Sequence, residues 1–158
     1  MNESEKHNYN IIEASPEDAS LLSSIAMEAK QYWGYPDEWM ELWKEDLKVT
    51  PAMIEEHGVW KIISENTITG FTIIIKEAEN YTVEHCFISP DYIGKGYGKA
   101  LLNYVFNLPQ YVNQPFTVLS DPHAVSFYEK FGFKTSHHIP SKPEGRTLPF
   151  MKRTPSDQ

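Results

Sequence analysis

Apolar positions in the first third of the chain recur at helical spacing. Residues 15–33 place Leu21, Leu22, Ile25, Ala26 and Ala29 on one helix face. Ser15 as N-cap and Pro16 at the first helical position predict where this helix begins, and a second helix is expected over 37–49. A short strand over 9–15 precedes these helices, and residues 50–58 predict a further helical turn or two.

The pattern changes to that of strands from residue 58 onward. The segments 58–65, 67–79 and 81–89 are rich in Val, Ile, Thr, Tyr and Phe, and turn residues separate them. This predicts three strands of an antiparallel meander. Gly70, inside the second of these segments, predicts a bulge or a close approach of two backbones.

Helix and strand alternate in the rest of the chain. We expect a helix over 96–107, a strand over 114–120, a helix over 121–132 and two closing strands. The order β-αα-βββ-α-β-α-ββ predicts an α/β (α+β) fold with a mixed, mostly antiparallel, twisted sheet of about 6–7 strands and about four helices. The 158 residues are expected to form one domain, 1–158, with frayed ends at 1–8 and 154–158.

Charge is distributed unevenly along the chain, and this limits which classes of molecule are expected to bind it. The net charge is −8, and residues 13–57 carry 11 acidic against 3 basic side chains, which accounts for the whole excess. Nucleic acid is not an expected partner, because phosphate contacts need a basic face. The acidic segment is interpreted as solvated helix faces or, alternatively, as a groove that attracts a cationic amine or basic peptide.

Several features that the sequence lacks indicate where the protein is located and whether it binds a metal. It has no apolar run near 18 residues, its first ten residues are polar, and Cys86 is the single cysteine. We therefore expect no membrane partner, no secretory signal, no internal disulfide and a cytoplasmic location. His137 and His138 would point to opposite sides of a strand and lack a third ligand, so no metal site is expected.

Glycines occupy alternate positions where the helix over 96–107 begins. Gly94, Gly96 and Gly98 are interleaved with Lys95 and followed by Lys99. A helix start presents unpaired N–H groups and the positive end of its dipole, and glycine lets an anion approach the backbone closely. The functional interpretation is a phosphate site, and the structural one is a tight strand-to-helix turn. The spacing fits neither a P-loop nor a dinucleotide fingerprint.

Two segments together resemble a known family. "DYIGKGYGKALL" (91–102) resembles the phosphate-binding loop of the GNAT superfamily, the acetyl-CoA-dependent N-acetyltransferases, and "DPHAVSFYEKFGF" (121–133) resembles a later helix of that family. Ile93 stands where Arg or Gln is usual, and Asp121 where Asn is usual. A bacterial GNAT subgroup without a settled acceptor is similar in the combination of "QYWGYPDEW", "KVTP", "EHCFISPDYIGKG", "SDPHAVSFYEKFGF" and "EGRTLPFM". The resemblance covers nearly the whole chain and implies the GNAT fold.

The resemblance implies a function and a donor site. It implies direct transfer of an acetyl group from acetyl-CoA (coenzyme A) to a primary amine of a small molecule or peptide, in a ternary complex. Main-chain N–H groups of a splayed strand and of the glycine loop would bind the donor. The cofactor-binding residues expected on this basis are Cys86, Phe87, Ile88, Ile93, Gly94, Lys95, Gly96, Tyr97, Gly98, Lys99, Asp121 and Ala124.

Three residues are the expected catalytic groups. The resemblance implies that Tyr128 protonates the departing thiolate; alternatively it is a core aromatic. Glu84 and His85 are candidate bases, although Glu84 could instead hold the acceptor's ammonium and His85 could be a hydrogen-bonded structural group. Strict alternation along 81–89 would place Glu84 with Cys86 on one face and His85 on the other, and a bulge would change this. Cys86 is interpreted as a small buried residue, not a nucleophile.

An acceptor site is expected near the first helix–helix turn. Tyr32, Trp33 and Tyr35 would wall it or cap the core, and Arg146 would bind an acceptor carboxylate or pair with a surface acid. The resemblance also implies that the chain can pair as a homodimer. The alternative function is a catalytically weak, CoA-binding regulatory or partner-binding module, which the departure at Ile93 favours and the retained Tyr128 disfavours.

Overall fold

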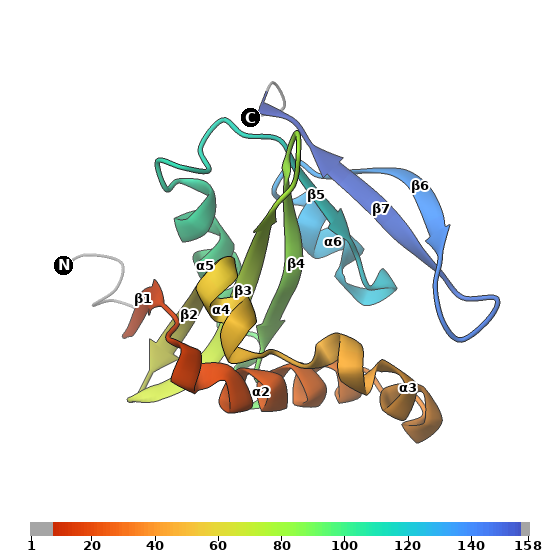
Figure 1. The fold of residues 1–158 in the computed structure, drawn as a ribbon, viewed down its shortest axis with the longest axis horizontal. Helices are drawn as coiled ribbons and strands as arrows, with labels where there is room; N and C mark the ends of the chain where they lie inside the picture. Colours follow the sequence, from red (N-terminus) through yellow and green to blue (C-terminus); the bar gives the residue numbers. More distant parts are fainter. Residues whose placement is uncertain (1–7, 156–158) are drawn as a thin grey trace.

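A seven-stranded sheet runs through the computed structural model, which describes residues 8–155 (Figure 1). The strand order is β1-β2-β3-β4-β5-β7-β6, and all pairings are antiparallel except the parallel pair β4–β5. The predicted fold class is confirmed. The strands are β1 (Tyr9–Glu13), β2 (Gly58–Ser64), β3 (Thr67–Lys76), β4 (Tyr81–Ile88), β5 (Phe116–Leu119), β6 (Lys134–Pro140) and β7 (Thr147–Arg153).

Five α-helices lie between residues 8 and 155, one more than the predicted order counts. The additional helix is α4, which forms because the Thr50 side chain accepts a hydrogen bond from the Met53 N–H and caps it. The predicted frayed ends lie mostly outside the described residues. The helices are α2 (Ala19–Gln31), α3 (Asp37–Leu47), α4 (Pro51–Glu56), α5 (Tyr97–Phe106) and α6 (Val125–Glu129), with 3₁₀ turns η1 (Pro16–Asp18), η2 (Pro90–Tyr92) and η3 (Pro122–Ala124).

The first helix begins with a 3₁₀ turn, η1, before α2. The Ser15 N–H donates to Asp18 Oδ2 at 2.8 Å, and Asp18 also accepts from Lys61 Nζ of β2 at 2.7 Å. The predicted start signal is therefore correct, and it also ties the start of this helix to the sheet.

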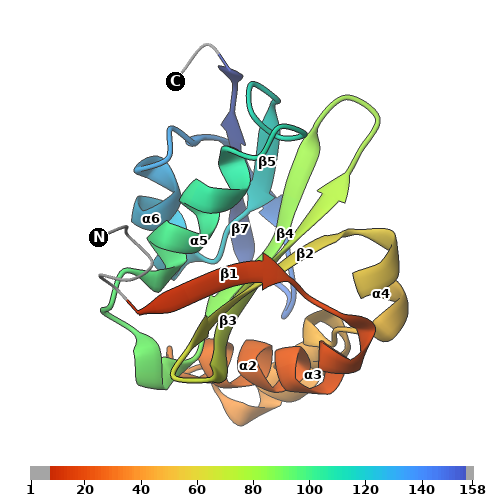
Figure 2. The same ribbon diagram turned by 90° about the vertical axis from the view of Figure 1, so that its left-hand side faces the viewer.

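Helices cover both faces of the sheet and divide the core in two (Figure 2). Side chains of α5 and α6 bury one face, around Leu101, Leu102 and Phe133, and those of α2 and α3 bury the other, around Leu22 and Phe71. β4 contributes to both cores, so its side chains decide what lies between the two helical layers.

A bulge in β4 changes the predicted alternation of its side chains. On β3, Ile73 faces His85 and Ile74 faces Val83, so Glu84 has no opposite residue. Val83 consequently packs in the same core as Cys86, whereas strict alternation would have put the two on opposite faces. His85 turns to the other face, where its ring lies 6.4 Å from that of Phe71.

Gly70 of β3 combines both features predicted for it. The β2–β3 register shifts beside it, between Ile62 and Ile63. A Cβ at Gly70 would lie 2.8 Å from the Phe87 carbonyl oxygen and 2.4 Å from Ile88 Cδ1 of β4. A side chain here would therefore push β4 away from β3.

β4 and β5 pair over a short segment and then separate. Their register joins Tyr81–Val83 to Phe116–Val118, while β4 continues to Ile88 and β5 ends at Leu119. The parallel pair therefore opens beyond Val83, as predicted for a splayed strand, and this opening positions the site.

Candidate functional site

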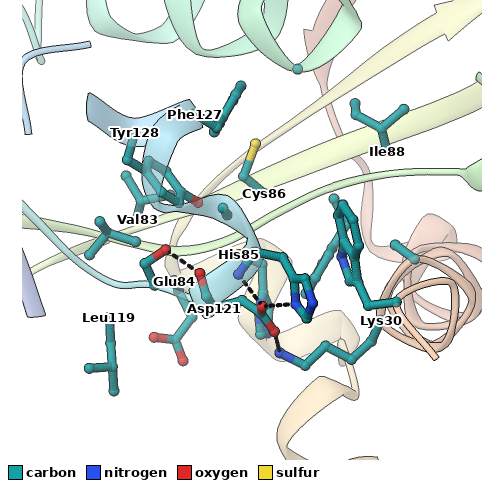
Figure 3. A pocket seen from close by; sticks show the side chains of 18 of the residues that line it. Lys30, Val83, Glu84, His85, Cys86, Ile88, Leu119, Asp121, Phe127 and Tyr128 are labelled. Carbon is teal, nitrogen blue, oxygen red and sulfur yellow. Dashed lines mark hydrogen bonds and ion pairs between the residues drawn. The ribbon is translucent and has the colours of Figure 1, made fainter. Parts of the chain in front are cut away.

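A cavity of about 880 Å³ opens where β4 and β5 separate. β4 forms its floor, the starts of α5 and α6 line one end, and α2, α3, η3 and the β6–β7 loop line the other. Figure 3 shows side chains that line the cavity. Tyr32, Tyr35 and Lys95 lie outside the lining. The predicted site residues that line it are Trp33, Glu84, His85, Cys86, Phe87, Ile88, Ile93, Gly94, Gly96, Tyr97, Gly98, Lys99, Asp121, Ala124, Tyr128 and Arg146.

The glycine loop presents bare backbone at the start of α5. Gly94 and Gly96 have φ of +87° and +80°, and a Cβ added to either would meet nothing within 4 Å. Gly96 is the N-cap of the ten-residue α5. Gly98 is needed for packing, since its Cβ would lie 3.3 Å from the Phe127 ring. The arrangement is a cradle into which an anionic group can fit against helix N–H groups.

Side chains of this loop point in different directions. The Tyr97 side chain is buried, and its hydroxyl donates to Ser64 Oγ at 2.9 Å. The main chain of Tyr97 is therefore the part left to contact a ligand, and the expectation for this loop was binding by main-chain N–H groups. Lys99 and Ile93 line the cavity, while Lys95 is exposed outside it.

Tyr128 combines a packed ring with an available hydroxyl. The ring lies 5.1 Å from that of Phe127 and 5.6 Å from that of Phe133, and the residue is 5% exposed. Figure 3 shows its hydroxyl pointing toward β4. No hydrogen bond to this hydroxyl forms within residues 8–155. Burial, with Cys86 and Asp121 nearby, raises the pKa of Tyr128 well above its ordinary value, so the proton is retained.

The neighbouring residues Glu84 and His85 have pKa values that are shifted in opposite directions. Burial raises the pKa of Glu84, and the charges of Glu77 and Asp46 add to this. Burial, with the nearby charge of Lys30, lowers the pKa of His85 to about 4. His85 is therefore neutral at pH 7. Its buried Nε2 has no hydrogen-bond partner among the described residues, which is unusual for a purely structural histidine.

Cys86 remains a thiol at neutral pH. Burial raises its pKa to about 12. The thiolate is the nucleophilic form of cysteine, so this environment agrees with the interpretation of Cys86 as a small buried residue.

A charged group centred on Asp121 closes the other end of the cavity. This Asp121 cluster comprises Lys30, Tyr35, Asp121, His123 and Arg146. Asp121 accepts hydrogen bonds from Lys30 Nζ at 2.5 Å, from the Tyr35 hydroxyl at 2.9 Å and from the His123 N–H at 2.8 Å. The His123 ring pairs with it at 2.9 Å through Nδ1, and Arg146 Nη2 lies 3.6 Å away.

The cluster sets the charge state of its carboxylate. Burial raises the pKa of Asp121, but the hydrogen bond and charge of Lys30, together with His123, outweigh burial and lower the pKa to about 2. Burial lowers the pKa of Lys30, and Asp121 offsets part of this effect. Asp121 also caps η3, as its sequence position predicted.

Sequence reasoning missed Lys30 and His123. Lys30 lies four residues after Ala26 and eight after Leu22, on the buried stripe of α2. A lysine in an apolar stripe was the available signal, because lysine is rarely buried without a partner. No comparable signal pointed to His123, whose role depends on contacts with Asp121 and with Trp33 and Tyr35 of the α2–α3 turn.

Aromatic rings support the Asp121 cluster. Trp33 stacks on His123 with ring centroids 4.7 Å apart, and Tyr35 packs against Trp43 at 4.9 Å. Tyr32 is 53% exposed and contacts Trp33 edge-on, outside the cavity lining. Trp33 is thus the one residue of the predicted trio in the cavity wall, while Tyr35 acts on the cluster through its hydroxyl.

The acidic segment contributes little to the cavity. Among the acidic residues of 13–57, only Asp46 lines it, and Lys142 Nζ pairs with Asp46 at 3.0 Å. The other carboxylates of this segment lie away from the cavity wall, so they do not make this cavity acidic.

The described chain has neither a metal-binding cluster nor a membrane-spanning helix. Residues 8–155 contain no group of three His, Cys, Asp or Glu side chains that could hold a metal ion. Within the same range, no helix has the length and apolarity needed to cross a membrane.

Comparisons with known proteins agree on one family. The model of the acetyltransferase (GNAT) domain matches residues 23–153. The PaiA N-acetyltransferase from Thermoplasma acidophilum, solved with coenzyme A, has a TM-score of 0.74 and 21% identity, over 92% of this chain and 98% of that one. A GCN5-related N-acetyltransferase from Rhodopseudomonas palustris has a TM-score of 0.76 and 19% identity, over 92% and 94%. No curated protein gives a significant match.

Proposed function

Because this chain belongs to the GNAT acetyltransferase family and is an acetyl-CoA-dependent acyltransferase, we propose that it acetylates a primary amine by direct transfer in a ternary complex. The observation that carries the proposal is the placement of Tyr128 and Glu84 in one cavity wall, where neither side chain forms a hydrogen bond or salt bridge within residues 8–155. We also propose that the whole chain, 1–158, acts as one domain.

The residues present fit the donor. The open cradle at Gly94 and Gly96 leaves room for a bulky anion beside the first N–H groups of α5, and Lys99 adds positive charge. Acetyl-CoA supplies the acetyl group as a thioester, whose sulfur needs a proton as it leaves. Main-chain N–H groups of Cys86 to Ile88, beyond the β4–β5 pairing, are the proposed donors to the thioester oxygen.

Tyr128 is the proposed proton donor. Its raised pKa keeps the hydroxyl protonated, and no competing acceptor in the described chain holds that proton. A tyrosine hydroxyl can donate to a thiolate because the thiolate is a strong base in a buried site where its charge is poorly solvated.

Glu84 is the proposed group for the acceptor amine. Its position on the bulge directs it into the cavity, and its raised pKa brings it closer to neutral pH as a base. His85 is the second candidate, since it is neutral and has a free Nε2, but its pKa of about 4 makes it a weaker base.

Replacing Glu84 by Gln should lower kcat/KM for the amine by about 10²-fold, the lower range for loss of a general base. In the wild type, a raised Glu84 pKa means that the active carboxylate forms as pH rises through that pKa. The part of the acidic limb of the kcat/KM profile that Glu84 causes should therefore be lost in the variant, whereas the part set by deprotonation of the amine itself remains. An unchanged acidic limb would assign the base to His85 or water, and His85→Gln would then distinguish those two.

Replacing Gly96 by Ala should weaken CoA binding by about tenfold, because a Cβ enters the cradle and φ of +80° is unfavourable for alanine. Gly34→Ala is the matched control, since Gly34 also has a positive φ (+83°) and no atom within 4 Å of an added Cβ. Both variants should lose similar stability in thermal melts. Equal CoA affinity of the two variants by isothermal titration would contradict the proposed cradle.

An amine panel tests the function as a whole. Purified protein and acetyl-CoA are incubated with small amines, amino acids and short peptides, with free thiol as readout and mass spectrometry to identify acetylated products. We expect amine-dependent thiol release for at least one class. CoA binding without thiol release for any amine would favour the regulatory module.

A further inference from the structure

We propose that the acceptor carries a carboxylate in addition to its amine, and that Arg146 binds this carboxylate. The inference rests on the proposed amine acetylation and names its substrate class: amino acids and related amino carboxylates.

The Asp121 cluster has an unbalanced buried charge. Lys30 and Arg146 both approach the single carboxylate of Asp121, at 2.5 Å and 3.6 Å. The side chains are 13%, 11% and 14% exposed for Lys30, Arg146 and Asp121. A buried positive charge without its own counterion is costly. An anionic ligand group would remove that cost.

The Arg146 guanidinium has unused hydrogen-bond donors, and aromatic rings fix its orientation. A guanidinium carries five N–H donors, and its hydrogen bond from Nη2 to the Tyr35 hydroxyl, at 3.2 Å, is the one formed with the described residues. Its central carbon lies 4.5 Å from the Trp43 ring centre and 5.2 Å from that of Tyr35. The rings hold the planar fork in the cavity wall, ready for a bidentate carboxylate.

The other charged side chains that line the cavity near the Asp121 cluster also matter for the acceptor. Asp46 and Lys142 neutralise each other at 3.0 Å. Glu84 is then the one carboxylate of the lining that forms no salt bridge within residues 8–155, although the charge of His57 acts on it. Beside the Asp121 cluster, the wall thus offers Glu84 as a negative group and Arg146 as a positive group that shares its carboxylate with Lys30; Lys99 and Lys130 also line the cavity. An acceptor with an amine and a carboxylate complements both, whereas a simple amine leaves Arg146 unmatched.

Binding of product analogues tests the inference without turnover. CoA-saturated protein is titrated calorimetrically with N-acetylglycine and N-acetylphenylalanine, and with their uncharged primary amides. We expect at least one acid to bind about 10- to 100-fold more tightly than its amide, the range for a charge-assisted hydrogen-bond pair. Arg146→Gln should reduce the ratio to about twofold or less, and Arg146→Lys, which keeps the charge but loses the fork, should give an intermediate ratio.

Lys152→Gln is the matched control, because it removes one positive charge from an exposed site on β7 outside the cavity. It should retain the full ratio. Equal binding of acids and amides by the wild type, or a full ratio in Arg146→Gln, would overturn the inference. If no amine in the panel released thiol, the proposed acetylation would be contradicted. A preference for the acid over its amide in the same protein would still support a carboxylate site at Arg146.

Discussion

Tyr128→Phe is expected to reduce kcat by 10²- to 10⁴-fold, the usual contribution of a general acid, while acetyl-CoA affinity changes by about twofold or less. The two effects separate because the ring packs on Phe127 and Phe133, which phenylalanine can reproduce, whereas the hydroxyl, which points toward β4 in the cavity wall, is lost. Steady-state thiol release gives kcat, and isothermal titration gives the affinity. Equal losses in both quantities would refute the acid assignment.

The pH dependence gives a second test of the same residue. The pKa of Tyr128 is raised well above its ordinary value of 10.0, so its acid form persists through the alkaline range. We expect wild-type kcat to show no falling limb between about pH 8 and pH 9.5, where an unperturbed tyrosine would begin to lose its proton. A tyrosine-dependent fall in that range would mean that the hydroxyl is more solvated than its burial indicates.

Asp121→Ala is expected to destabilise the protein by about 3–5 kcal/mol, because it leaves the buried charges of Lys30 and Arg146 without a counterion. For a chain of this size the melting temperature should fall on the order of 10 °C. Asp46→Ala is the control. It breaks the Lys142–Asp46 pair, whose side chains are 50% and 58% exposed, and should cost about 0.2–1 kcal/mol. Similar losses in the two variants would show that the Asp121 cluster is not structurally important.

The same carboxylate predicts an acid-dependent loss of stability. The pKa of Asp121 is lowered from 3.8 to about 2 in the folded state. A depressed folded pKa means that the contribution is complete above the unfolded pKa and is lost as pH falls toward the folded one. We therefore expect wild-type stability to decline between about pH 4 and pH 2 more steeply than that of Asp121→Asn, measured by urea denaturation at each pH.

Much of the fold could be predicted because its signals are local. Caps at Ser15, Thr50 and Asp121 mark where helices or 3₁₀ turns begin, and the glycines of the 94–98 loop mark a turn of positive φ. These depend on hydrogen bonds and backbone conformations within a few residues. The β4 bulge was not predictable in this way, because it depends on how β4 pairs with β3 along its length.

The sequence by itself determined the order of helices and strands, the glycine loop at the N-terminus of α5, and the placement of Tyr128 on the helix after β5. Each of these follows from residue type and short-range spacing. The tertiary structure alone decided the chemistry of the acceptor end. Lys30, Asp121 and Arg146 are far apart in sequence, and packing of α2 and the β6–β7 loop against η3 brings their charges together. A charge excluded from water acts through its spatial neighbours, so an acidic chain can still present a cationic surplus in its cavity.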